Sequence, residues 1–255
     1  MRLGAALPLA DLGGGPPSAR SFADAAYAVE ELGYTSLWTF DAVGRGFILP
    51  DPLMALTAAA TVTERIELGT GIMQLPIRNV MEVAHRLFTL ELMAPGRVLF
   101  GVGPGSTEAD FGAFGGAFAE RFTTFEQQWA DLRAIVADGG LGERQLSPWP
   151  QVLGGPTLML AGWRGRWVQR SATESSGWIA SGMYASDEEL ADGIGRYRAA
   201  GGQRAVVTNL QAGEDLAPTI ERLGRLAALG FDDAVVIDFT PSHDRLAAVR
   251  AAVPQ

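Results

Sequence analysis

The feature that most constrains the fold is an alternation along the whole chain. Short apolar runs alternate with segments whose apolar residues recur every three or four positions, as on one face of a helix (helical stripes). Several runs, such as 98–100 and 234–237, are apolar without an in-out alternation, which is typical of parallel strands covered on both faces. The runs predict eight strands, at Arg2–Leu9, Thr35–Phe40, Ile66–Leu75, Arg97–Val102, Thr157–Leu160, Trp178–Ala180, Ala205–Leu210 and Ala234–Phe239.

Helical stripes separate these runs, so each strand is expected to be followed by a helix. Ser186 and Glu189 have the spacing of a capping box, and glycines at 33, 139 and 230 mark expected helix ends. The first four strands start at residues 2, 35, 66 and 97, so the steps are 33, 31 and 31 residues. Such regular units favour a closed (β/α)₈ barrel over an open doubly wound sheet.

The fourth unit is longer than the others, because the next strand starts at residue 157, 60 residues after residue 97. Two segments, Gly103–Phe118 and Gly139–Pro156, have the composition of extended loops. No composition shift marks a domain boundary. The prediction is α/β: a single barrel domain over residues 1–255.

Missing residue types exclude many mechanisms. The chain has no cysteine and two histidines, and all 20 basic residues are arginine, so there is no lysine. Schiff-base chemistry, thiol nucleophiles, thiolate metal sites and a three-histidine zinc site are therefore excluded. A net charge of −9 without a basic run argues against nucleic acid or an anionic membrane as a partner. With its N-terminal segment interpreted as a buried strand, the chain is expected to be cytoplasmic.

In a barrel, function concentrates at the carboxyl ends of the strands. After the second strand, Asp41 is a candidate to accept a ligand N–H or to act as a base, or else to bond neighbouring backbone. In the third strand, Gly69 and Gly71 indicate a bulge, close approach of a ligand, or close packing. His85 and His243 are expected on helices, as structural or surface residues.

Two glycine-rich segments follow the next strands. Gly101–Ser106 resembles a dinucleotide fingerprint but lacks its third glycine, so it is interpreted as a wall for a flat ligand. Ala161–Arg166 enters a helix with glycines and arginines, which suits an anion such as phosphate. Arg121 is expected to reach the same anion. Solvated or carboxylate-paired arginines are the alternative.

The order of these segments resembles the luciferase-like monooxygenase family, whose members use FMN or the deazaflavin coenzyme F420. The resemblance runs from the first strand to the last and is strongest over residues 33–126. The segments that carry it are Gly33-Tyr34, Trp38–Asp41, Arg65–Thr70, Met81–Ala84, Pro95–Gly105, Phe111–Gly115 and Arg121–Glu126.

This resemblance implies that the isoalloxazine ring lies in the barrel mouth, against a non-prolyl cis peptide at Gly71–Ile72. It also implies a phosphate pocket at 162–165 and a homodimer. Asp41 is the candidate for proton transfer. The expected cofactor contacts are Trp38, Asp41, Gly71, Ile72, Gly103, Pro104, Gly105, Ser106, Arg121, Ala161, Gly162, Trp163, Arg164 and Gly165.

Two departures bear on mechanism. Many members of the family have a histidine where this chain has Ala42, and some F420-dependent dehydrogenases have a glutamate where it has Ser106. The chemistry is therefore expected to belong to the cofactor, with hydride moving to or from a small organic substrate. The lysine-free composition, rich in alanine, glycine and arginine, suggests a high-GC source, and the resemblance implies F420 ahead of FMN because actinobacterial members of the family often use F420. A cofactor-binding barrel without turnover and a barrel isomerase or lyase for phosphorylated substrates are the competing hypotheses.

Overall fold

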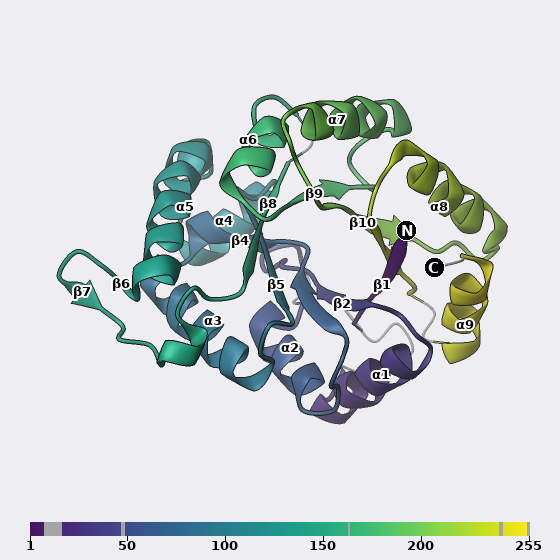
Figure 1. The fold of residues 1–255 in the computed structure, drawn as a ribbon, viewed down its shortest axis with the longest axis horizontal. Helices are drawn as coiled ribbons and strands as arrows, with labels where there is room; N and C mark the ends of the chain where they lie inside the picture. The colour runs from purple at the N-terminus through teal and green to yellow at the C-terminus, as the bar shows by residue number, and fades with distance from the viewer. Residues whose placement is uncertain (8–16, 47–48, 163, 240–241, 254–255) are drawn as a thin grey trace.

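The computed structural model describes residues 1–7, 17–46, 49–162, 164–239 and 242–253, and its strands form a closed parallel barrel (Figure 1). Neighbouring strands pair in the order β3-β2-β1-β11-β10-β9-β8-β5-β4, and a further pairing of β3 with β5 closes the ring. This confirms the predicted barrel. The strands are β1 (Arg2–Ala6), β2 (Ser36–Thr39), β3 (Glu67–Thr70), β4 (Met73–Gln74), β5 (Val98–Gly103), β8 (Thr157–Ala161), β9 (Gly177–Ser181), β10 (Ala205–Gln211) and β11 (Asp233–Ile237).

Helices surround the barrel and cover the outer face of every strand (Figure 1). The predicted capping box closes the start of α7, where Ser186 Oγ accepts from the backbone N–H of Glu189. Gly139 and Gly230 end α5 and α8 in the left-handed conformation, which glycine adopts without steric cost. The ring consists of α1 (Ala19–Glu31), α2 (Pro52–Ala60), α3 (Val80–Met93), α5 (Arg121–Asp138), α6 (Trp167–Glu174), α7 (Asp187–Ala199), α8 (Ala217–Leu229) and α9 (His243–Ala252).

Three segments differ from the prediction. The expected strand at 66–75 is broken at Gly71–Ile72, whose peptide bond is cis as the resemblance implied. The loop-like segment 103–118 contains the helix α4 (Glu108–Phe114), because Asp110 and Phe111 are buried and hold this short helix on the barrel. The segment 139–156 contains a short hairpin of β6 (Gly140–Leu141) and β7 (Arg144–Gln145).

The barrel interior is a small apolar core, separate from the larger core between strands and helices. Its largest side chain is Trp38, which is fully buried and donates its indole N–H to Ser36 Oγ at 2.8 Å. The ring needs neighbours without a Cβ, since a Cβ at Gly4 or Gly69 would lie 2.8 and 2.5 Å from it. Trp38 therefore fills the barrel below the mouth.

Ion pairs close the opposite end of the barrel, where the strands begin. Arg204 pairs with Glu67 at 2.6 Å and with the fully buried Asp233 at 3.0 Å, and Arg2 also reaches Asp233. The charged side chains at this end are paired with one another, and barrel proteins carry their functional sites at the carboxyl ends of the strands, so we expect the site there. Within the described residues, no helix combines the length and apolarity that crossing a membrane requires.

Candidate active site at the barrel mouth

The carboxyl ends of the strands present a mostly apolar surface to the interior of the barrel. Inward-facing side chains alternate with outward-facing ones, as the extended backbone of a strand requires. Among the described residues at these strand ends, β9 and β10 contribute hydroxyl and amide groups to this surface, while the amide of Gln74 on β4 is buried and hydrogen-bonded to Asp110. We call the following set the mouth layer: Ala6, Phe40, Ile72, Gly103, Ala161, Ser181, Thr208, Asn209 and Ile237.

One wall of the mouth contains the predicted residues Gly103 and Gly105, which pack closely against their neighbours. A Cβ on Gly103 would lie 3.2 Å from Ile72 Cδ1 and 3.6 Å from Ala161 Cβ, so Gly103 lies between these two side chains with little room for a side chain of its own. Gly105 has φ +79°, and a Cβ there would lie 2.5 Å from Gln74 Oε1. Pro104 and Ser106 extend this wall to the rim, where Ser106 is exposed.

Behind this wall lies a buried polar network centred on Asp110, which the sequence reasoning missed. The carboxylate is fully buried and accepts from Arg45 Nη2 at 2.6 Å and from Gln74 Nε2 at 2.9 Å. It also accepts the backbone N–H groups of Val43 and Gly44, each at 3.2 Å. Although burial would raise the pKa of Asp110, these hydrogen bonds hold it below its ordinary value.

Asp41, the predicted base, belongs to the same region but has committed partners. Arg78 Nη2 donates to Asp41 Oδ1 at 2.8 Å, and the backbone N–H of Gln74 donates to Oδ2 at 3.0 Å. The Asp41 side chain is 4% exposed. Burial raises its pKa, against the opposing charge of Arg78. In this geometry Asp41 anchors β4 to the loop after β2.

The predicted anion site around 162–165 is only partly free. Arg164 pairs with Glu189 at 3.0 Å and is 73% exposed, and Arg166 pairs with Glu126. The alternative of carboxylate-paired arginines therefore holds for these two residues. Gly162 directly follows β8 and has φ +154°. A Cβ added at this position would lie only 2.7 Å from Trp167 Cβ. Gly165, with φ +60°, stands just before α6.

Arg121 differs from these arginines, because no described carboxylate lies within ion-pair distance of it. Its guanidinium stacks on Phe118 at 3.8 Å and on Phe122 at 4.3 Å, and Nη1 donates to the Phe118 carbonyl. The buried Nε has no hydrogen-bond partner. Phe122 in turn stacks on Trp167, the first residue of α6. The Phe122–Trp167 stack thus holds the first turn of α5, which carries Arg121, beside the N-terminus of α6, and the contact of Arg121 with an anion there stays a prediction.

The remaining candidates divide between the interior and the surface. Trp38 has no exposed area, so it supports the mouth from below. Trp163 lies outside the described residues. His85 and His243 are exposed on helices, as expected. Among the described residues, no group of three histidine or carboxylate side chains is placed to hold a metal ion.

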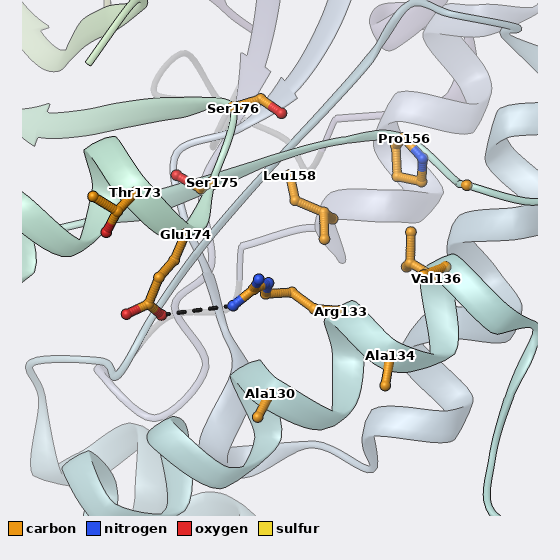
Figure 2. Close-up of a pocket in the computed structure, with 12 residues that line it drawn as sticks. Ala130, Arg133, Ala134, Val136, Pro156, Leu158, Thr173, Glu174, Ser175 and Ser176 are labelled. Atoms are coloured by element: carbon orange, nitrogen blue, oxygen red, sulfur yellow. Dashed lines mark ion pairs between the residues drawn. The ribbon is translucent and has the colours of Figure 1, made fainter. Parts of the chain in front are cut away.

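An open hollow of about 720 Å³ lies between α5 and α6, away from the mouth. Its lining includes Arg133, Glu174 and Leu158, and Figure 2 shows the Arg133–Glu174 ion pair, 3.8 Å long, within it. Leu158 stands at the start of β8, so this hollow belongs to the amino-terminal end of the barrel. It contains none of the predicted site residues.

Comparison with known proteins places the chain in a family. Limonene 1,2-monooxygenase of Rhodococcus erythropolis is 37% identical over 83 residues, which are 32% of this chain and 21% of that protein. An F420-dependent glucose-6-phosphate dehydrogenase of Intrasporangium calvum is 33% identical over 124 residues, 46% of this chain and 36% of that protein. The matched segments thus span well under half of either relative.

Structural comparison agrees at the level of the fold. The crystal structure of the monooxygenase RslO1 from Streptomyces bottropensis superposes with a TM-score of 0.77, covering 99% of this chain and 97% of that chain at 17% identity. At this identity the likeness describes the fold alone. The profile of the luciferase-like monooxygenases matches residues 1–213, so the chain belongs to the luciferase-like monooxygenase family.

Proposed function

We propose that this chain is an oxidoreductase that moves a hydride between bound coenzyme F420 and a small organic substrate, with FMN as the alternative cofactor. The observation that carries the proposal is a small, apolar wall at the mouth together with Arg121, which has no carboxylate partner among the residues that the structure describes. When bound, such a cofactor would supply the ring atom that accepts or donates the hydride, a carbon in the deazaflavin and a nitrogen in FMN. Both cofactors combine a planar ring system with a phosphate.

The residues present fit both parts. The wall of Ile72, Gly103 and Ala161 offers a flat apolar surface to the ring, since Gly103 adds no side chain. Arg121 and the first turn of α6 offer positive charge and free backbone N–H groups to the phosphate. The named activities of relatives include both a monooxygenase and an F420-dependent dehydrogenase, so they support this class of chemistry without choosing the cofactor.

The chain's own part in the reaction is orientation and exclusion of water. Apolar mouth residues such as Phe40 and Ile237, 8% and 3% exposed, keep water from the interior side of the ring. The hydrogen-bonded Asp110 holds the loop after β2 against β4, which fixes the position of the wall. Because Asp41 is paired with Arg78, we assign it to this support and not to proton transfer.

Fluorescence titration of the purified chain with F420 and with FMN tests the proposal. We expect one of them to bind with a Kd below about 100 μM. Arg121→Gln should weaken that binding about 10- to 100-fold, because a hydrogen bond to a charged group is lost. Arg144→Gln, at an exposed arginine of the β6–β7 hairpin, is the matched control and should bind as the wild type does. Failure of both cofactors to bind would refute the proposal.

Turnover separates an enzyme from a barrel that only binds its cofactor. The bound F420 or FMN should change its absorbance when substrates of the class inferred below are supplied. A protein that binds the cofactor tightly but never reduces or oxidises it would support the binding-only alternative.

A further inference from the structure

The polar groups of the mouth layer gather on one side, at the carboxyl ends of β9 and β10. Ser181 ends β9, and Thr208 and Asn209 stand beside it on β10. Five of the remaining mouth residues are apolar side chains and the sixth is Gly103. A ligand seated against the wall therefore meets hydrogen-bonding groups mainly on the side of Ser181 and Asn209.

A bulge in β10 places Asn209 there. In the pairing of β10 with β11, Val207 lies opposite Ala234 and Leu210 lies opposite Val236. Between these two pairs β10 has two residues and β11 has one, so β10 contains one extra residue. All four of these side chains belong to the outer core. Thr208 and Asn209 together oppose the single inward-facing residue between Ala234 and Val236. Bulges of this kind re-aim side chains, often next to active sites.

The backbone of Asn209 is unusual as well. Its φ is +60°, a region that side chains other than glycine seldom occupy, although asparagine tolerates it better than most. The side chain points toward its polar neighbours, with Nδ2 at 3.5 Å from Ser181 Oγ and 3.4 Å from Thr208 Oγ1. The chain thus places a carboxamide at the mouth where a glycine would satisfy the backbone.

The hydrogen-bonding capacity of this pair is largely unused. Thr208 is committed, since its hydroxyl donates to the Ala180 carbonyl at 3.2 Å. Asn209 Oδ1 accepts from no described group, and it is not sealed from solvent. The Ser181 hydroxyl donates to no described acceptor and receives only the long contact from Asn209. One acceptor and one donor are therefore free side by side.

The charged residues around the pair are already neutralised. Asp238 pairs with Arg245 at 2.8 Å, and Arg222 pairs with Asp187 while donating to the Gly182 carbonyl. No described cation near Ser181 is left for a phosphate or carboxylate of a substrate. An apolar mouth with one neutral donor and one neutral acceptor suits an uncharged molecule.

We propose that Asn209 and Ser181 bind the substrate, and that this substrate is a neutral organic molecule carrying a carbonyl or hydroxyl oxygen on an apolar skeleton. A carbonyl oxygen accepts from the Ser181 hydroxyl and from Asn209 Nδ2, and a hydroxyl group also donates to Asn209 Oδ1. The apolar skeleton lies against the mouth layer. This inference rests on the proposed function, because the bound cofactor forms the opposite side of the substrate site.

Asn209→Gly is the decisive variant, since glycine accepts the positive φ and removes only the carboxamide. Binding of cyclopentanone and of glucose 6-phosphate to the cofactor-loaded protein would be measured by saturation-transfer NMR and calorimetry. We expect the wild type to bind cyclopentanone and not the sugar phosphate. Asn209→Gly should weaken cyclopentanone binding about fivefold or more, as loss of about 1 kcal/mol implies. Ser181→Ala should act in the same direction.

Two further measurements distinguish failure of this inference from failure of the proposed function. Gln203→Ala, at an exposed amide just before β10 and away from the mouth, is the control and should bind cyclopentanone as the wild type does. Cofactor titration of every variant should give the wild-type Kd, and absence of cofactor binding in the wild type itself refutes the proposed function. With cofactor bound, no cyclopentanone binding up to about 10 mM, unchanged binding in Asn209→Gly, or preferential binding of glucose 6-phosphate overturns this inference alone.

Discussion

Replacing Asp110 with alanine should destabilise the barrel strongly, although the residue lies in a short helix outside the ring. The carboxylate is fully buried and receives hydrogen bonds from the Arg45 guanidinium, the Gln74 amide and two backbone N–H groups. Breaking a buried ion pair by removing one partner costs about 3–5 kcal/mol. The Arg45 side chain is 27% exposed and can turn to solvent, so we expect the lower end of that range, about 3 kcal/mol.

Differential scanning calorimetry measures this loss. For a chain of this size, about 3 kcal/mol corresponds to a Tm decrease of roughly 6–12 °C. Asp138→Ala removes an exposed aspartate at the end of α5 and should change stability by less than about 0.5 kcal/mol. If Asp110→Ala melted within about 2 °C of the wild type, the network would not hold the mouth together and the reasoning above would be refuted.

Three further predictions concern the same framework. Because hydrogen bonds keep the pKa of Asp110 below its ordinary value of 3.8, the ionised carboxylate stabilises the folded chain fully above that pH, and this stabilisation is lost as the pH falls through the lowered pKa. The difference in Tm between the wild type and Asp110→Ala should therefore narrow below pH 3.8. A difference that stays constant would contradict this reasoning. Gly69→Ala would place a Cβ 2.5 Å from the buried Trp38 ring and should cost about 1–3 kcal/mol in urea denaturation, where an unchanged midpoint would argue against the packing. Gly103→Ala would place a Cβ 3.2 Å from Ile72 and should weaken F420 or FMN binding in the fluorescence titration more than it lowers Tm; equal cofactor affinity would contradict the assignment of this wall.

Much of the fold was predictable because its signals are local. The apolar runs became parallel strands, and the regular spacing of strand and helix leaves little choice but a barrel. The capping box at Ser186 and the glycines after α5 and α8 were found from neighbouring residues alone. Helix α4 was missed because Asp110 and Phe111 hold it on the barrel through contacts outside the segment itself.

The candidate site was predicted less completely, because it depends on pairs of residues far apart in the chain. Arg164 and Arg121 look alike in the sequence, yet Arg164 faces Glu189 and Arg121 faces two aromatic rings. Asp41 stands where an active-site acid would stand, and only the folded chain brings Arg78 to it. Local patterns carry no information about such partners.

The sequence by itself determined the barrel, the small residues of its mouth and the kinds of chemistry that the chain lacks, because periodicity, turn residues and composition are properties of short segments. Only the tertiary structure decided which charges are free. It left Arg121 without a carboxylate partner among the described residues, paired Asp41 with Arg78, and used one extra residue in β10 to turn Asn209 into the mouth. Those outcomes depend on strand register and on the packing of helices against strands, which bring together side chains that are separated in the sequence.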